Sequence, residues 1–261
     1  MAASVHESVG ARSKRRVSRL LVKILPLHTL RELKFEIQMS RLRLTHRRID
    51  ASLANERELL VNVGCGPNGL PGWVNIDCYS DEGVTCVRDC RVALPLATGS
   101  ARGIFTEHFL EHLDYYEEAP RFLQECRRVL APGGLLRIIV PDGAKHLQAY
   151  LDEGWTSLRT LTPLVSWDPE GEHQRSTSQG PLLPFKTKME VINFHFTQMG
   201  EHRFSYDFET LSLLLAHCGF ESIVQRQFRE SSMPEMAIDQ EFRALESLVV
   251  EAISPRSNEN T

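Results

Sequence analysis

Between residues 58 and 140, short apolar runs alternate with stretches rich in polar residues, turn formers and helical periodicity. The short runs predict buried strands, and residues 116–130 predict an amphipathic helix that ends at the Ala-Pro-Gly-Gly sequence of 131–134. Strands that alternate with helices in this way form a parallel sheet. The predicted strands are 59–63, 73–76, 85–88, 103–106 and 135–140.

The flanking segments predict further elements. Residues 19–49 predict one or two amphipathic helices, with Pro26 separating an upstream turn from the main helix. Asp207 is a suitable cap for a helix over 208–217, residues 221–228 alternate like a strand, and 235–253 predict a final helix. Residues 143–205 contain four prolines and many polar residues, so we expect an inserted region of loops and short helices suited to a substrate lid.

Charge divides the chain of 261 residues unevenly. Residues 1–48 hold 12 Lys and Arg against 3 acids, although the whole chain has a net charge of −4. We therefore expect a basic arm with an amphipathic helix (1–49), an α/β domain (50–230) and a C-terminal helix with a polar tail (231–261). The arm suits an anionic membrane surface, nucleic acid or a protein partner, or it is simply a tail followed by a packed helix.

The remaining composition is that of a soluble protein, with 42% hydrophobic and 25% charged residues. Six cysteines without a C-x-x-C pair predict reduced thiols, hence a cytoplasmic protein, peripheral at the membrane if the basic arm binds lipid. Because the domain after the arm is acidic, nucleic acid is a poor candidate for the substrate. Nothing in the sequence indicates the oligomeric state.

The most informative segment joins the first two predicted strands. Residues 61–66 (Val-Asn-Val-Gly-Cys-Gly) end an apolar run in two glycines, and the next apolar run ends at Asp77. Glycine lets a loop approach a ligand closely, and a carboxylate can accept the hydroxyl protons of a ribose. Gly66 and Asp77 are only eleven positions apart, too few for a full crossover helix and a strand, so we expect a turn at Pro71 and Gly72 instead.

These residues, with later ones in order, resemble the class I S-adenosylmethionine-dependent methyltransferases. Residues 61–66 resemble the first motif of that family, and Ile76 and Asp77 resemble its ribose-binding strand end. Residues 88–95 resemble the adenine-binding segment, residues 106–113 the strand end beside the methyl group, and residues 128–134 the turn into the fifth strand. The resemblance covers roughly 58–142, with a weaker similarity at 203–228. The short first crossover resembles a subgroup of predicted methyltransferases linked to polysaccharide or glycan assembly.

The resemblance implies an α/β, Rossmann-like fold: a mostly parallel seven-stranded sheet, with an antiparallel strand near the end, flanked by helices. It implies S-adenosylmethionine as the cofactor, with Asp77 on the ribose, Asp89 on the adenine, and 64–67 along the methionine end and sugar. Asn62 stands where the family often has an acid, and Asn68 where a third glycine is common. The predicted cofactor-binding residues are Asn62, Gly64, Cys65, Gly66, Pro67, Asp77, Cys78, Asp89, Cys90 and Glu107.

Three histidines are candidates for the catalytic base, because methyl transfer to a hydroxyl needs a proton acceptor near neutral pH. His108 follows the fourth predicted strand, whereas His195 and His202 lie in the inserted region and at its exit. A hydrogen-bonded structural histidine is the alternative for each. His108, His112 and Glu111 suggest a metal site, but no further ligand is spaced to complete it, so we predict no metal.

The sequence therefore predicts an enzyme that methylates oxygen on a sugar, glycolipid or related small metabolite. The alternative is a non-catalytic protein that binds S-adenosylmethionine as a regulatory or scaffolding module. A nicotinamide-dependent oxidoreductase is disfavoured, because a G-x-G-x-x-G helix start is missing after the first strand.

Overall fold

The computed structural model describes residues 25–45, 52–162, 175–177, 180–182 and 185–256. The chain divides into two units, residues 1–47 and 48–261. The described part of the first unit is α2 (Leu27–Thr45), which begins directly after Pro26 as predicted. Within this helix, Arg43 donates to Glu36 at 3.2 Å and to Ser40 at 3.1 Å. The basic arm predicted at the start of the chain falls outside the described residues.

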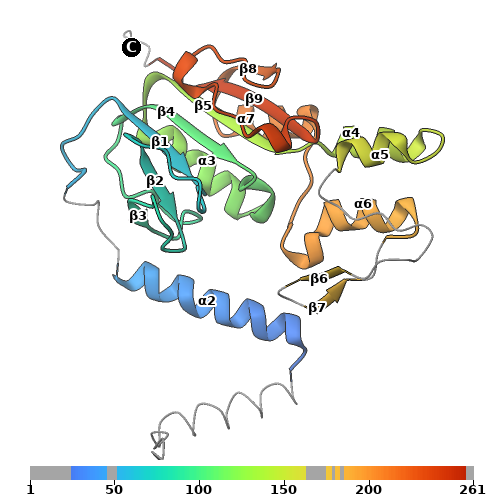
Figure 1. The fold of residues 1–261 in the computed structure, drawn as a ribbon. Helices are drawn as coiled ribbons and strands as arrows, with labels where there is room; N and C mark the ends of the chain where they lie inside the picture. The colour runs from blue at the N-terminus through green and yellow to red at the C-terminus, as the bar shows by residue number, and fades with distance from the viewer. Residues whose placement is uncertain (1–24, 46–51, 163–174, 178–179, 183–184, 257–261) are drawn as a thin grey trace, which may run out of the picture. The chain divides into compact units, whose positions relative to one another are not determined.

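The second unit is built on a seven-stranded sheet (Figure 1). Its strand order is β3-β2-β1-β4-β5-β9-β8, and β9 runs antiparallel to both of its neighbours while β1 to β5 are parallel. This is the predicted mostly parallel sheet with an antiparallel strand near the end. The strands are β1 (Leu59–Val63), β2 (Val74–Asp77), β3 (Cys86–Val87), β4 (Ala101–Glu107), β5 (Leu130–Pro141), β8 (Glu221–Arg226) and β9 (Ser247–Ile253).

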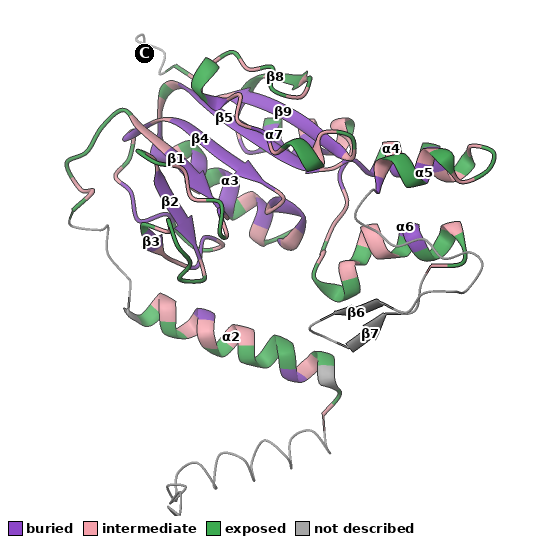
Figure 2. Ribbon diagram, in the orientation of Figure 1, coloured by how far each residue is buried: buried purple, intermediate pink, exposed green. Residues whose placement is uncertain are grey.

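Apolar side chains cover both faces of the sheet, and the central strands are buried along most of their length (Figure 2). On one face, α3 (Glu118–Val129) and α7 (Phe208–His217) contribute Phe122 and Leu215, among others, to the main core. On the other face, Ile139 and Val249 pack in a smaller cluster with Met236 of the short 3-10 turn η3 (Pro234–Met236). Both faces of β5 and β9 are therefore inaccessible to water.

Most elements match the sequence. β1 has the predicted bounds, and α7 begins at the predicted residue, because the Asp207 side chain accepts the Thr210 N–H at 2.8 Å and caps it. Residues 64–73, between β1 and β2, form turns without a helix, as the short spacing to Asp77 required. Among the described helices, none has the length and apolarity needed to span a membrane.

The predicted C-terminal helix over 235–253 is wrong. The segment contains η3, a second 3-10 turn η4 (Glu241–Arg243) and then β9. Its glutamates, leucines and alanines favour a helix locally, but Val249 and Val250 fit a strand that is buried on both faces. As a strand between β5 and β8, this segment forms hydrogen bonds on both sides and buries its apolar side chains, so tertiary packing overrides the local helix propensity.

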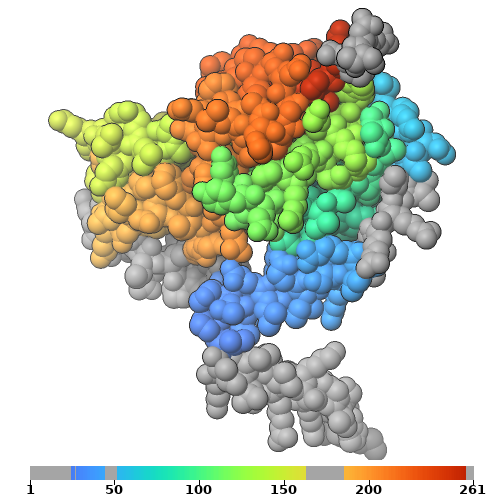
Figure 3. All heavy atoms as spheres, turned by 180° about the vertical axis from the view of Figure 1, so that it is seen from behind, coloured from blue at the N-terminus to red at the C-terminus, as the bar shows by residue number. Residues whose placement is uncertain are grey.

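The inserted region carries short elements, as expected. They are α4 (Gly143–Leu151), α5 (Thr156–Leu161), the two-stranded β6 (Arg175–Thr177) and β7 (Gly180–Leu182), α6 (Lys188–Thr197) and the 3-10 turn η2 (Gln198–Gly200). Ala149, Leu158, Val191 and Ile192 form a small core of their own. Seen from behind, α4 with α5 and α6 lie side by side at one end of this unit (Figure 3). The role of a lid stays a prediction.

Candidate active site

The loop after β1 is shaped by two glycines with left-handed backbone. Gly64 has φ +70° and Gly66 φ +50°. A Cβ atom at Gly64 would come within 2.6 Å of the Phe109 ring, whereas a Cβ at Gly66 would meet nothing within 4 Å. Gly64 is thus required by both conformation and space, and Gly66 by conformation while it leaves open room beside the backbone. That open room suits a cofactor lying along the loop.

Asp77 fastens this loop from the carboxyl end of β2. One carboxylate oxygen accepts the Gly66 N–H at 2.8 Å, and the other accepts the Tyr79 N–H at 2.9 Å. A carboxylate has about four acceptor positions, so Asp77 can still accept a hydrogen bond from a ribose hydroxyl. The structure therefore brings Gly66 and Asp77 together at one sheet edge, as the sequence predicted.

The side chain of Asn62 forms hydrogen bonds within the loop between β1 and β2. Its buried amide donates to the Asn68 carbonyl at 3.2 Å and to the Asn75 side chain at 3.3 Å. Asn75 in turn accepts the Leu70 N–H at 2.8 Å. A carboxylate at position 62 could not donate these bonds, which explains why an amide replaces the family's usual acid here. Its predicted contact with the cofactor stays a prediction.

Asp89 lies just after β3, and its carboxylate is held by Arg91. The guanidinium donates to both oxygens, at 2.9 and 3.0 Å, and also to Glu118 at the start of α3, at 3.1 Å. This pair fixes the carboxylate plane, and one of the two oxygens also accepts the Arg91 backbone N–H at 3.2 Å, so that oxygen takes two hydrogen bonds and the other takes one. The predicted contact of Asp89 with the adenine stays a prediction.

The other predicted cofactor residues differ in exposure. Cys65 and Cys90 are buried and Cys78 is half-buried. Burial raises the pKa of Cys65 and Cys78 to about 12 and that of Cys90 well above its usual value. These thiols stay uncharged at neutral pH, so they can offer apolar contact but no charge. Pro67 is exposed on the loop.

Glu107 is the last residue of β4 and is buried. One of its oxygens accepts the Gln240 N–H at 3.1 Å, and the other accepts no hydrogen bond from the described residues. Burial raises the pKa of this carboxyl.

A cavity of about 250 Å³ opens at the carboxyl ends of β4 and β5. We call it the histidine pocket, because all three predicted catalytic histidines line it although they come from segments 94 residues apart. Its lining residues are His108, Glu111, His112, Pro141, Thr162, Phe194, His195, Gln198, His202, Phe242, Arg243 and Glu246.

The predicted catalytic histidines are held neutral in this pocket. Burial lowers the pKa of His108 to about 2, that of His195 to about 3 and that of His202 to about 4. His108 also has an unusual left-handed backbone, with φ +51°, and its Nε2 lies 2.8 Å from Ser247 Oγ. Neutral imidazoles carry a free lone pair at pH 7, although such low pKa values make them weak proton acceptors. Their catalytic roles stay a prediction.

Two carboxyl groups of the pocket, the buried Glu111 and the half-buried Glu246, were not predicted as catalytic. Burial raises the pKa of Glu111 to about 8 and that of Glu246 to about 7. Glu111 was visible beside His112 in the sequence, but Glu246 and Arg243 were hidden by the wrong prediction of a helix over 235–253. Glu246 enters the pocket because it directly precedes β9, where its oxygen lies 4.0 Å from His195 Nδ1.

Comparison with known proteins agrees with this architecture. The methyltransferase-domain family model matches residues 76–138, which contain Asp77, Asp89 and His108. A search of the curated proteins found no match.

Similar solved structures include S-adenosylmethionine-dependent methyltransferases from Mesorhizobium loti (16% identity, TM-score 0.41, 78% of this chain and 94% of that one) and Archaeoglobus fulgidus (17%, 0.42, 87% and 100%). A possible histamine N-methyltransferase from Thermotoga maritima is also similar (19%, 0.42, 85% and 97%). At these sequence identities and TM-scores, the similarity carries no argument about function. The family match over residues 76–138 and the strand order support a class I S-adenosylmethionine-dependent methyltransferase, with S-adenosylmethionine as the cofactor.

Proposed function

We propose that the protein transfers the methyl group of S-adenosylmethionine to a hydroxyl oxygen of a small acceptor, such as a sugar, a glycolipid headgroup or a related metabolite. The observation that carries this proposal is the histidine pocket at the carboxyl ends of β4 and β5, lined by histidines, glutamates, one arginine and apolar residues. In open α/β sheets, ligands bind outside the carboxyl ends of the strands.

The pocket adjoins the cofactor loop through a single residue. Phe109 packs against Gly64 of the loop, and its neighbour His108 lines the pocket. A cofactor lying along Gly64 and Gly66 would therefore end near the pocket. Methyl transfer needs the acceptor oxygen, the methyl carbon and the sulfur in line. A cofactor whose sulfur end meets the pocket would allow an acceptor in the pocket to take up that alignment.

The chemistry of the lining favours a small polar acceptor. A cavity of about 250 Å³ is below the range of roughly 300–1,000 Å³ that drug-sized ligands occupy. Phe194 and Phe242 offer apolar surface, and the imidazoles and carboxyls offer hydrogen bonds. Among the lining residues, Arg243 is the one with permanent positive charge, so a polyanion such as nucleic acid is a poor fit.

The reaction forms a bond between the acceptor oxygen and the methyl carbon and breaks the bond between that carbon and the sulfonium sulfur. The sulfur keeps the bonding electrons and leaves as S-adenosylhomocysteine. The hydroxyl proton has to go to a base in the same step or before it, and the imidazole nitrogens and carboxylates of the pocket are the groups within reach of a bound acceptor.

A methyl-transfer assay on paired acceptors tests the proposal. Radiolabelled S-adenosylmethionine would be incubated with sugars, glycolipid headgroups and matched amino sugars, with Asp77→Ala as the cofactor-site control. We expect label on hydroxyl acceptors with the native protein and none with the variant. Transfer to amines alone would contradict O-methylation. Stabilisation by S-adenosylhomocysteine without turnover on any acceptor would favour the regulatory or scaffolding alternative.

A further inference from the structure

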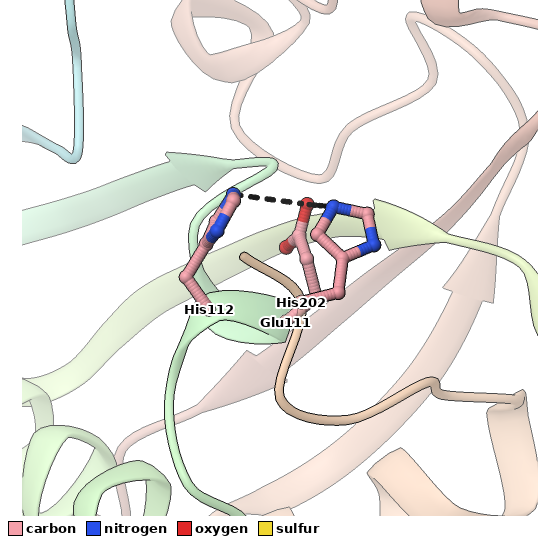
Figure 4. A group of neighbouring side chains, drawn as sticks. All are labelled: Glu111, His112 and His202. Atoms are coloured by element: carbon pink, nitrogen blue, oxygen red, sulfur yellow. Dashed lines mark ion pairs between the residues drawn. The ribbon is translucent and has the colours of Figure 1, made fainter. Parts of the chain in front are cut away.

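Three side chains from two distant segments converge in the histidine pocket. Glu111 and His112 belong to the 3-10 turn η1 (Leu110–His112) after β4, and His202 follows η2 some 90 residues later. The Nε2 atoms of His112 and His202 each lie 4.0 Å from the same Glu111 oxygen, with the carboxylate between the two rings (Figure 4). All three possible ligand atoms lie within 4.8 Å of one another.

Backbone hydrogen bonds hold the two segments together. The Glu111 carbonyl accepts the N–H groups of Arg203 and Phe204, at 2.7 and 3.2 Å. His202 is therefore fixed against η1 by the chain itself and does not depend on side-chain contacts for its position. Such support from rigid backbone is what a binding site for an ion requires.

A backbone carbonyl next to Nδ1 fixes the tautomer of each histidine, His112 and His202. His112 Nδ1 lies 3.1 Å from the Glu201 carbonyl, and His202 Nδ1 lies 2.7 Å from the His195 carbonyl. A carbonyl can only accept, so each Nδ1 carries the proton and donates it. Each Nε2 then presents a lone pair towards Glu111, which is the arrangement found in metal-binding histidines, whose other nitrogen donates to a carbonyl or carboxylate.

Glu111 supplies a second and independent observation. Its side chain is only 1% exposed, and neither carboxylate oxygen accepts a hydrogen bond from the described residues. A buried carboxyl group that makes no hydrogen bond is costly, and the nearest side-chain nitrogen, His108 Nδ1, lies 3.4 Å from its Oε1 without forming one. A cation between the three groups would remove that cost.

We propose that Glu111, His112 and His202 bind a divalent transition-metal ion, with Zn²⁺ as the best fit, through one carboxylate oxygen and two Nε2 atoms. Two histidines and one glutamate leave a fourth tetrahedral position for water or substrate, as in catalytic zinc sites. Neighbouring ligands of a tetrahedral zinc ion are about 3.4 Å apart. The two separations of 4.0 Å therefore need to close by about 0.6 Å, and the two imidazole nitrogens, within 4.8 Å of each other, have to approach as well. The sequence-based prediction of no metal lacked His202 as the third ligand.

The open coordination position would face the histidine pocket, because all three ligands line it. An ion there would bind the acceptor oxygen and favour loss of its proton, since a metal ion lowers the pKa of a bound hydroxyl or water. This role rests on the proposed function, whereas the binding of the ion does not.

The pocket offers a matched comparison site. His146, His195 and Glu246 also lie close enough to share an ion. There, however, the imidazole rings of His146 and His195 are 4.1 Å apart and tilted towards stacking, and His195 faces Glu246 through Nδ1. Glu246→Gln is therefore the control for Glu111→Gln: each substitution removes one carboxyl group from the same pocket.

The experiment measures metal binding directly, without an activity readout. The full-length protein would be stripped with chelator, dialysed and titrated with Zn²⁺ by calorimetry, and with Co²⁺ by its visible d–d absorption. We expect one ion per chain for the native protein and for Glu246→Gln. We expect at least a 100-fold weaker association of Zn²⁺ for Glu111→Gln and His202→Ala. Zn²⁺ should raise the melting temperature of the native protein and of Glu246→Gln, but not that of Glu111→Gln.

Circular dichroism and melting without metal would show that the variants fold, and Glu111→Asp would serve as a second probe that keeps the carboxylate. Native-like Zn²⁺ affinity in a folded Glu111→Gln protein would overturn the proposal, as would the absence of stoichiometric binding in the native protein. Loss of binding in Glu246→Gln with retention in Glu111→Gln would also overturn it, and would assign the ion to the comparison site. Methyl transfer by a metal-free native protein would leave the binding site intact and contradict only its catalytic role.

Discussion

Replacing Asp77 with alanine should impair both the cofactor loop and cofactor binding. The carboxylate accepts two backbone N–H groups, from Gly66 at 2.8 Å and Tyr79 at 2.9 Å. Hydrogen bonds to charged groups contribute about 1.5–3 kcal/mol each, so losing both should lower the free energy of unfolding by roughly 3 kcal/mol, less what water recovers at this partly open loop. Loss of the ribose contact and of the loop geometry should weaken S-adenosylhomocysteine binding by about 100-fold, equivalent to about 2.7 kcal/mol.

Two measurements separate these effects. Urea denaturation gives the change in unfolding free energy, and titration calorimetry with S-adenosylhomocysteine gives the change in affinity. Asp81→Ala is the matched control, because Asp81 is an exposed carboxylate in the turn just after β2, and it should change neither quantity by more than about 0.5 kcal/mol. Wild-type affinity in a folded Asp77→Ala protein would show that Asp77 does not bind the ribose.

The remaining predictions concern stability. Gly64→Ala should lower the unfolding free energy by more than about 1 kcal/mol in urea denaturation, because it places a Cβ 2.6 Å from a phenylalanine ring at φ +70°; an unchanged midpoint would contradict this. Asp239→Asn should cost about 3–5 kcal/mol, since it leaves the fully buried Arg137 short of one charged partner, and Arg137→Met should cost at least as much, because it leaves the buried Asp239 and Glu251 without their cation. Burial raises the pKa of Glu251, but hydrogen bonds from neighbouring serines and Arg137 outweigh burial and lower it below 4.5. Its stabilising contribution should be complete above pH 4.5 and lost as the pH falls through the lowered pKa, so Glu251→Gln should flatten the acid side of the stability curve measured in urea.

The sequence pattern predicted an element correctly where the residues of that element alone determine its burial, length or cap. β1 could be predicted to the residue, because a short apolar run bounded by a glycine loop is a buried parallel strand in this context. The missing first helix followed from the eleven positions between Gly66 and Asp77 alone. The Asp207 cap fixed the start of α7 for an equally local reason.

The elements that could not be predicted depend on partners far along the chain. β9 carries Glu251 at its centre, which no local rule places inside a sheet, and the reason is Arg137, its register partner on β5. The same holds for the histidine pocket. His108 and Glu111 are visible together in the sequence, but His202 joins them only because two backbone amides bind the Glu111 carbonyl.

A crystal structure of the protein with S-adenosylhomocysteine would test the central claim most directly. Our account predicts the ribose hydroxyls within hydrogen-bond distance of Asp77, the methionine end along Gly64 and Gly66, and the sulfur directed towards His108 and the histidine pocket. Binding of the ligand away from the carboxyl ends of β1 and β2, or with its sulfur facing away from that pocket, would contradict it.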